Sequence, residues 1–252
     1  MEKEKGYHPG WILATGAFLL AITALYVFRL VALGEGDRLL PIYSVETGEK
    51  KAAVTFNCAW DPENLPEILK TLEEHQAKAT FFAVGQWAEE NPDAVKAIIE
   101  AGHEIGSHSN THPDMTKIPE EKIREELCRA RERIKKAGGG TAALFRAPSG
   151  AYDNTVVKTA AEEGFTTIQW DVDSRDWQDK SAGEMVEAVT KNVKNGSILL
   201  FHVGKKNTAE ALPRILEILE QQGFRFVPVS ELIYTENYTI DHEGRQHSLK
   251  NE

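Results

Sequence analysis

The sequence predicts an α/β fold in which parallel strands form a distorted (β/α) barrel. Short apolar runs alternate with longer amphipathic runs about seven times, which is the pattern of strands joined by helical crossovers. The strand runs are nearly all apolar, as expected when helices cover both faces of a sheet. An open, doubly wound sheet is the alternative. Either architecture places the chemistry at the carboxyl ends of the strands.

Each element follows from its local pattern. The candidate strands are the apolar runs 52–56, 79–84, 103–107, 143–147, 166–172, 197–201 and 224–229. The candidate helices are the amphipathic runs 63–76, 86–101, 119–137, 153–163, 181–194 and 208–222. Ser181 with Glu184 three residues later predicts a capping box at the start of one helix. Glycines follow several of the predicted helix ends, where a left-handed residue is favoured.

The segment 11–33 is apolar over its whole length apart from a few residues. About 20 such residues span a bilayer core, so we predict a single transmembrane helix that precedes the barrel. A cleaved signal peptide is the alternative, although its apolar region is usually shorter. Cationic residues near the span give only a weak orientation signal. We expect a single-pass protein of the cell membrane with its domain on the extracytoplasmic side, mainly because of the chemistry described below.

These segments define the expected domain organisation. A cytoplasmic tail (1–10) precedes the anchor, and a linker (34–50) leads into the folded domain (51–234), which a polar tail (235–252) follows. The net charge is −10, and Lys and Arg do not cluster with aromatic residues, which argues against nucleic-acid binding. The two cysteines, Cys58 and Cys128, exclude a disulfide framework but leave one bridge possible.

Polar and aromatic residues gather where five of the predicted strands end. The exits read "NCAWDP", "HSNTH", "APSGAYD" after Arg146, "DSRDW" and "HVGK". Loops that only connect elements seldom need so many His, Asp, Arg and Trp residues together. Because the carboxyl ends of parallel strands meet at one edge, we expect these exits to form a single site.

Histidines are the first candidates in that site. His108 and His112 are four residues apart, so their imidazoles can converge on one metal ion, whether in a helical turn or a loop. Two solvated loop histidines are the alternative for an isolated pair. His202 ends a strand and could act as a general acid if a carboxylate orients its ring. Asp173 is preferred for that task over Asp171 and Asp176.

The motifs together resemble the polysaccharide deacetylases of the NodB-homology type, carbohydrate esterase family 4. The resemblance covers about residues 50–234, and its five motifs come in the order of the family. "TFNCAWD" stands where the family has TFDDG, "HSNTH" matches H-S/T-x-x-H, and "RAPSG" matches R-x-P-x-G. "WDVDSRDW" and "LLFH" match the last two motifs. The membrane-anchored, sporulation-type members are the most similar overall.

The resemblance implies a fold, a reaction and a cofactor. The fold would be the distorted barrel of the NodB-homology type. The reaction would be metal-dependent hydrolysis of an N-acetyl group from a cell-wall polysaccharide, either peptidoglycan or another N-acetylglucosamine polymer. His108 and His112 would hold a divalent metal ion, zinc or cobalt, which polarises the acetyl carbonyl and a bound water. O-acetyl ester hydrolysis at the same site is a weaker alternative.

The remaining roles also follow from the resemblance. His202 would protonate the departing amine, Asp173 would tune it, and Arg146 would position the base. Ser149, whose turn offers a backbone N–H to the oxyanion, would bind the substrate together with two tryptophans. Those tryptophans are Trp170, which would form a wall of the acetyl pocket, and Trp177. Taken alone, a histidine such as His202 is more often structural than catalytic, and Arg146 could have a structural role too.

One motif departs from the family. The first motif normally supplies two adjacent carboxylates, a base and a metal ligand, and this chain has Asn57 and Cys58 there. Asn57 cannot accept a proton at neutral pH. We expect Asp61, in the same loop, to serve as ligand or base, and Cys58 is the alternative zinc ligand. The missing base also leaves a second possibility for the whole protein, a catalytically impaired homologue that only binds glycan.

Overall fold

The computed structural model describes residues 38–140 and 143–249. The predicted anchor (11–33) lies outside these ranges. Among the described residues, none of the helices has the length and apolar character that crossing a membrane requires.

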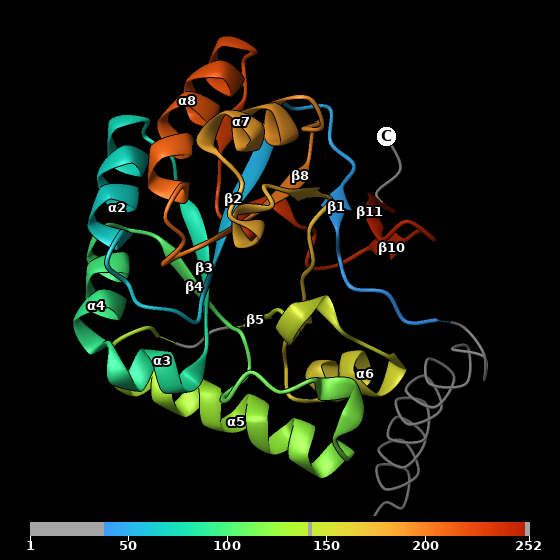
Figure 1. Ribbon diagram of the computed structural model, residues 1–252. Coiled ribbons are helices and arrows are strands. Elements are labelled where there is room, and N and C mark those ends of the chain that lie inside the picture. Colours follow the sequence, from blue (N-terminus) through green and yellow to red (C-terminus); the bar gives the residue numbers. More distant parts are fainter. Residues whose placement is uncertain (1–37, 141–142, 250–252) are drawn as a thin grey trace, which may run out of the picture. The chain divides into compact units, whose positions relative to one another are not determined.

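The centre of the fold is a parallel sheet (Figure 1). Its neighbouring strands, in order, are β8 (Ser197–His202), β2 (Lys51–Cys58), β3 (Ala79–Ala83), β4 (Glu104–Ser107), β5 (Leu144–Phe145) and β6 (Thr166–Thr167). The side chains of β2 and β3 are almost all buried, which explains why their sequences are mostly apolar.

One extended segment joins the two edges of this sheet. β6 pairs with β5, whereas β7 (Val172–Asp173), five residues further along, pairs in parallel with β8. Ile42 forms a bridge to Ile168 between β6 and β7. The sheet therefore curls back on itself, which confirms the expected α/β class and barrel-like architecture and disfavours the open sheet. The single predicted strand 166–172 is interrupted at this point.

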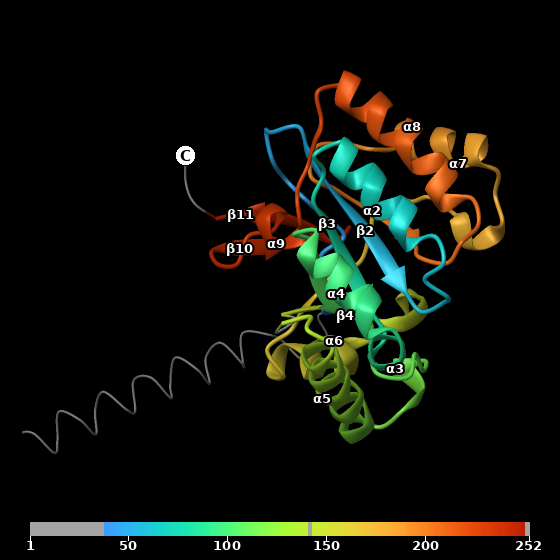
Figure 2. The same cartoon turned by 90° about the vertical axis from the view of Figure 1, so that its left-hand side faces the viewer.

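Helices cover the sheet on its outer side (Figures 1 and 2). They are α2 (Leu65–Glu74), α3 (Gly85–Glu90), α4 (Pro92–Glu100), α5 (Glu120–Lys136), α6 (Asn154–Glu162), α7 (Ala182–Thr190) and α8 (Thr208–Gln221). The short α9 (Val229–Leu232) packs instead with Ala53 and Ile198, on the opposite face of the sheet. The predicted helix 86–101 is two helices, because Pro92 lacks an N–H and disfavours helical geometry at Asn91 (φ −126°, ψ 56°). The predicted capping box of Ser181 and Glu184 is present at the start of α7.

The boundaries of the folded unit are wider than expected. β1 (Ser44–Val45) lies inside the expected linker, and the hairpin of β10 (Tyr238–Ile240) and β11 (Arg245–Ser248) lies inside the expected tail. β11 pairs with β1, and β1 pairs with β8, so both segments belong to the sheet. These strands escaped the prediction because they are short and, in the hairpin, mostly polar. The remaining short elements are η1 (Met115–Lys117), η2 (Pro148–Gly150), η3 (Asp176–Gln178) and β9 (Arg225–Phe226).

Candidate active site

The polar strand exits meet around one cavity of about 340 Å³. The predicted residues that line it are His108, His112, Ser149, Trp170, Asp173, Trp177 and His202. Asn57, Trp60, Leu200 and Lys205 complete its wall. A larger cavity of about 710 Å³ lies between α2 and α4 and contains none of the predicted residues.

His108 and His112 form a pair at the end of β4. Their ring centroids are 4.9 Å apart and their planes are nearly perpendicular. His108 Nδ1 lies 2.7 Å from the carbonyl oxygen of Arg146, which can only accept, so Nδ1 carries the proton and Nε2 keeps its lone pair. Burial lowers the pKa of His108 well below its usual value and also lowers the pKa of His112. Both rings are therefore neutral at pH 7, which is the form that binds a metal.

A loop, rather than a helical turn, carries these two histidines. Ser109 (φ 63°) and His112 (φ 61°) adopt left-handed conformations, which turn the chain back on itself. Glu126 of α5 holds the loop, because its carboxylate accepts hydrogen bonds from the backbone N–H groups of Asn110 and Thr111 at 2.9 and 2.8 Å. The geometry of the pair thus depends on packing against α5.

Arg146 is completely buried behind the cavity. Its guanidinium donates to Thr55 Oγ1 (2.9 Å), Asn57 Oδ1 (3.1 Å) and the carbonyl oxygen of Gln169 (3.0 Å). All three acceptors are neutral. Burial without an adjoining carboxylate lowers the pKa of Arg146, and the charge of the more distant Asp173 partly opposes this effect.

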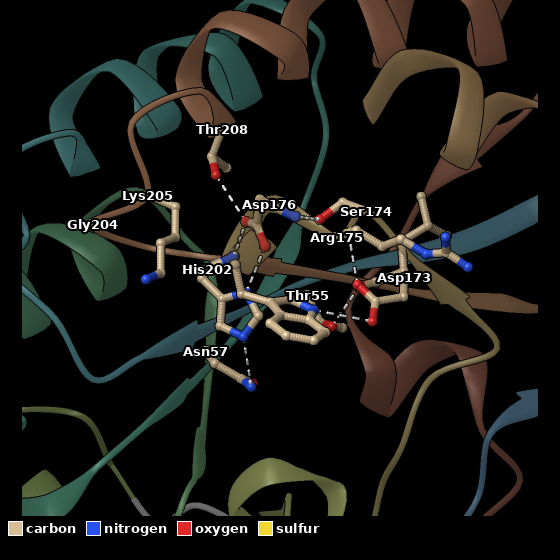
Figure 3. Close-up of polar contacts among 12 residues, drawn as sticks. Thr55, Asn57, Asp173, Ser174, Arg175, Asp176, His202, Gly204, Lys205 and Thr208 are labelled. Carbon is tan, nitrogen blue, oxygen red and sulfur yellow. Dashed lines mark hydrogen bonds and ion pairs between the residues drawn. The ribbon is translucent and has the colours of Figure 1, made fainter. Parts of the chain in front are cut away.

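Asn57 connects Arg146 to His202. Because the guanidinium can only donate, the amide oxygen of Asn57 must face Arg146, and the amide nitrogen then faces His202. Asn57 Nδ2 lies 3.5 Å from His202 Nε2, a long contact in which Nε2 accepts (Figure 3). Asn57 therefore favours the tautomer of His202 that carries its proton on Nδ1.

The carboxylate that orients His202 is Asp176, and the prediction of Asp173 for this task is corrected. His202 Nδ1 lies 2.6 Å from Asp176 Oδ1. Asp176 Oδ2 accepts from the backbone N–H of His202 (2.7 Å) and from Thr208 Oγ1 (2.8 Å), as Figure 3 shows. The left-handed backbone of Arg175 (φ 59°) turns the chain after β7, so Asp176 points back toward β8. The sequence carries no signal for that turn.

Asp173 has a different environment. Its carboxylate accepts from the backbone N–H of Arg175 (2.7 Å) and from Trp177 Nε1 (3.3 Å). It thereby orients the ring of Trp177, which is 49% exposed at the cavity edge. Asp173 remains in the cavity wall, but as a support for a tryptophan.

Trp170 and Ser149 lie on the side of the cavity formed by the segments after β5 and β6. Ser149 (φ 54°) and Gly150 (φ 68°) make a left-handed turn. A Cβ atom on Gly150 would lie 2.9 Å from Trp170 Cη2, so the close approach of the indole requires glycine there. The predicted substrate residues Ser149, Trp170 and Trp177 all line the same cavity.

Asp61 and Cys58 do not join the histidine pair. Asp61 Oδ1 accepts from the backbone N–H of Glu63 (3.0 Å) in the turn before α2, and Asp61 does not line the cavity. Cys58 alternates with Asn57 along β2 and is fully buried in the apolar core, where burial raises the pKa of its thiol far above its usual value. Within residues 38–140 and 143–249, no three His, Cys, Asp or Glu side chains are grouped as metal ligands. Both cysteines are free.

Two polar or aromatic residues of the cavity wall, besides the apolar Leu200, had no role in the prediction. Trp60 follows β2 and Lys205 follows β8, so both stand in strand exits that the sequence had marked as polar. Their positions could be read from the sequence. Their contact with each other could not, because it depends on how two loops pack.

Comparison with known proteins gives a consistent picture. The family described as polysaccharide deacetylase matches residues 44–168. A peptidoglycan-N-acetylglucosamine deacetylase of Bacillus cereus is 37% identical over 196 residues, which are 76% of this chain and 92% of that protein. An uncharacterized protein of Bacillus subtilis, YlxY, is 36% identical over 193 residues, 77% of this chain, but the match spans only 60% of YlxY.

Solved structures include both active and inactive relatives. BA3943 of Bacillus anthracis, described as a pseudoenzyme of carbohydrate esterase family 4, has a TM-score of 0.75 and 34% identity, covering 82% of this chain and 72% of that one. A mutant of BA3943 is described as having restored enzymatic activity. The peptidoglycan N-acetylglucosamine deacetylase Bc1960 has a TM-score of 0.74 and 32% identity, covering 77% of this chain and 93% of that one.

Proposed function

Because the chain belongs to the polysaccharide deacetylase family, a family of hydrolases that act on carbon–nitrogen bonds, we propose that it removes N-acetyl groups from a cell-wall glycan that contains N-acetylglucosamine. The observation that carries the proposal is the meeting of three imidazoles, those of His108, His112 and His202, in one cavity walled by tryptophans.

A divalent cation, zinc or cobalt, belongs to this proposal. The residues fit it in part: His108 and His112 offer neutral imidazoles side by side, and Nε2 of His108 has its lone pair available. The other coordination positions would fall to water and substrate, since Asp61 lies outside the cavity wall. When bound, the cation would polarise the acetyl carbonyl and acidify a water molecule.

His202 is the residue of this chain that moves the proton. With Nδ1–H directed at Asp176, its Nε2 would exchange the long 3.5 Å contact with Asn57 for the attacking water, accept a proton from it and deliver that proton to the amine nitrogen as the C–N bond breaks. The buried carboxylate of Asp176, which accepts from Nδ1–H, would stabilise the imidazolium between these two steps. No carboxylate stands at Asn57 to share this work.

The other residues bind and orient the substrate. A backbone N–H of the turn at Ser149 would donate to the oxyanion that forms when water attacks the acetyl carbon. Trp170 would enclose the acetyl methyl group and limit the access of bulk water. Arg146 holds Asn57 and, through it, the tautomer of His202.

The experiment measures acetate release from N-acetylglucosamine oligomers and from peptidoglycan by the full chain, purified in mild detergent with added Zn²⁺ or Co²⁺. We expect release that a chelator abolishes and that His108→Ala reduces strongly. The matched control is His75→Ala, because His75 pairs with Glu220 outside the cavity. Absence of acetate from both substrates under all metal conditions would contradict the proposal.

A second function, glycan binding without hydrolysis, is favoured by one specific observation. The position of the family's base is held by Asn57, whose amide oxygen is engaged by Arg146. This function predicts that N-acetylglucosamine oligomers and peptidoglycan both bind with measurable affinity while no acetate appears. It also predicts that Trp170→Ala weakens the binding. Acetate release by the wild-type chain would rule it out.

We also propose that the segment 11–33 anchors the protein in the cell membrane with the folded domain outside. The apolar length of this segment and the extracytoplasmic location of cell-wall glycans support this arrangement. Protease treatment of intact spheroplasts is expected to degrade the domain. If the domain is protected from the protease, or if the protein is found in the soluble fraction after the membranes are removed, the proposed anchor is contradicted.

A further inference from the structure

Trp60 and Lys205 form a contact at the edge of the cavity that the proposed mechanism does not use. Lys205 Nζ lies 4.0 Å from the centroid of the Trp60 ring. The Trp60 ring in turn meets His202 edge to face, with 5.2 Å between ring centroids and 78° between planes. The pair therefore borders directly on the residue to which we assign proton transfer.

The two loops that carry this pair are fixed to each other. Asn64 donates from Nδ2 to the carbonyl oxygen of Lys205 (2.9 Å) and accepts from the N–H of Gly204 at Oδ1 (2.7 Å). A Cβ on Gly204 (φ 83°) would lie 2.5 Å from the carbonyl oxygen of Asp61, so the loops touch at backbone level. Trp87 Nε1 also donates to the carbonyl oxygen of Trp60 (2.6 Å). The backbones of Trp60 and Lys205 are thus positioned before any ligand binds.

The charge of Lys205 has no carboxylate partner among the residues that the structure describes. Its ammonium contacts the face of Trp60, and it is the one Lys or Arg side chain among the residues that line the cavity. Asp173, the acidic residue of that wall, lies on the other side of His202 in Figure 3 and is engaged by Trp177 and Arg175. The cavity edge therefore has a cation next to an indole that is 40% exposed.

We propose that Trp60 and Lys205 form a subsite for an amino sugar that carries a carboxylate, next to the sugar that is deacetylated. An indole offers an apolar surface with a polar edge to a sugar ring, and the ammonium pairs with the carboxylate. This inference rests on the proposed function and specifies its substrate class. The preferred glycan is an acidic N-acetylated polymer with carboxylates on its sugars, rather than a neutral N-acetylglucosamine polymer.

The net charge of the chain is −10, so a cation at the cavity edge stands out against an acidic protein. An acidic protein repels an acidic polymer at long range, so recognition of that polymer depends on attraction at the contact itself. Binding of the acidic glycan should accordingly depend on Lys205 most strongly at low ionic strength.

The test compares two oligomers of equal length with the full chain. One is built of N-acetylglucosamine alone, and the other alternates N-acetylglucosamine with its lactyl ether, which carries a carboxylate. Acetate release and the dissociation constant are measured for both. We expect kcat/KM to favour the acidic oligomer about three- to tenfold at low salt, and Lys205→Met to remove this ratio.

Two further variants refine the test. Lys206→Met is the matched control, because Lys206 is exposed, adjacent in sequence and absent from the cavity wall, and it should keep the ratio. Lys205→Arg should restore most of the preference for the acidic oligomer.

An unchanged ratio in Lys205→Met, or equal use of the two oligomers by the wild type, would overturn the subsite and leave the deacetylase function intact. Conversely, no acetate from either oligomer, with binding of the acidic one weakened only by Lys205→Met, would overturn the deacetylase function and support the subsite.

Discussion

Arg146 Nη1 donates a hydrogen bond to Asn57 Oδ1 over 3.1 Å, so a buried cation meets a neutral amide where the family has a carboxylate. Arg146 Nε has no hydrogen-bond partner among the described residues, and the aromatic rings of Phe82 and Trp170 lie 4.1 and 5.5 Å from the guanidinium carbon. The site therefore keeps the cation of an ion pair without its anion.

Asn57→Asp tests this relationship. The new carboxylate would pair with Arg146, which should raise the free energy of unfolding by about 1–3 kcal/mol, because an uncompensated buried charge is costly. It would also supply a second proton acceptor and raise acetate release at least about tenfold. Denaturant unfolding and acetate assays measure the two effects. A less stable variant with unchanged acetate release would contradict the interpretation of Arg146 and Asn57.

The assignment of Asp176 leads to a second prediction. Asp176→Asn removes the acceptor that fixes the Nδ1–H tautomer of His202, and loss of such a carboxylate lowers kcat by up to about 10⁴-fold in related geometries. Asp173→Asn should cost far less, because Asp173 supports Trp177 rather than His202. The two variants are compared by kcat at saturating substrate. If Asp173→Asn is the more damaging one, the assignment is wrong.

Metal binding gives a third prediction. His108→Ala removes an imidazole whose orientation is fixed by the carbonyl oxygen of Arg146 and should raise the dissociation constant for Zn²⁺ by about 100-fold or more. Asp61→Asn should leave that constant unchanged, since Asp61 lies outside the cavity wall. Calorimetric titration of the metal-free chain measures both. If both variants lose zinc affinity equally, Asp61 is a metal ligand and our placement of it outside the site is wrong.

The fold and the site differ in how much the sequence predicted. The apolar runs located the strands, and the polar residues after them located four site residues, His108, His112, Arg146 and His202. Both signals are local, because the periodicity of apolar residues and the residue types at a strand end can be read from a few neighbouring positions. The sequence could not show that Asp176, rather than Asp173, is the partner of His202. That pairing depends on one left-handed residue after β7. The short strands β1, β10 and β11 were missed for a similar reason: their pairing, rather than their composition, makes them strands.

The C-terminal hairpin leads to a prediction on pH. His247 lies 2.8 Å from Asp241 through Nε2 and 2.8 Å from Glu46 through Nδ1, and these two carboxylates raise its pKa. A histidine with a raised pKa in the folded state stabilises the fold fully below its unfolded pKa of about 6.5, and the contribution disappears as the pH rises through the folded value. Because the group is partly exposed, we expect less than about 1 kcal/mol.

His247→Gln measures this contribution. The variant should lower the free energy of unfolding at pH 6 and have a smaller effect at pH 9, where the wild-type histidine is neutral. Urea unfolding at both pH values gives the difference. An effect that is equal at the two pH values, or larger at pH 9, would mean that the charge of His247 does not stabilise the hairpin.

The most direct test of the central claim follows the acetyl methyl signal of an N-acetylated glycan by NMR during incubation with the zinc-loaded chain. The account predicts that the wild type converts this signal to that of free acetate and that His202→Gln slows the conversion at least about 100-fold with little change in glycan affinity. Equal conversion by the wild type and His202→Gln would contradict the account.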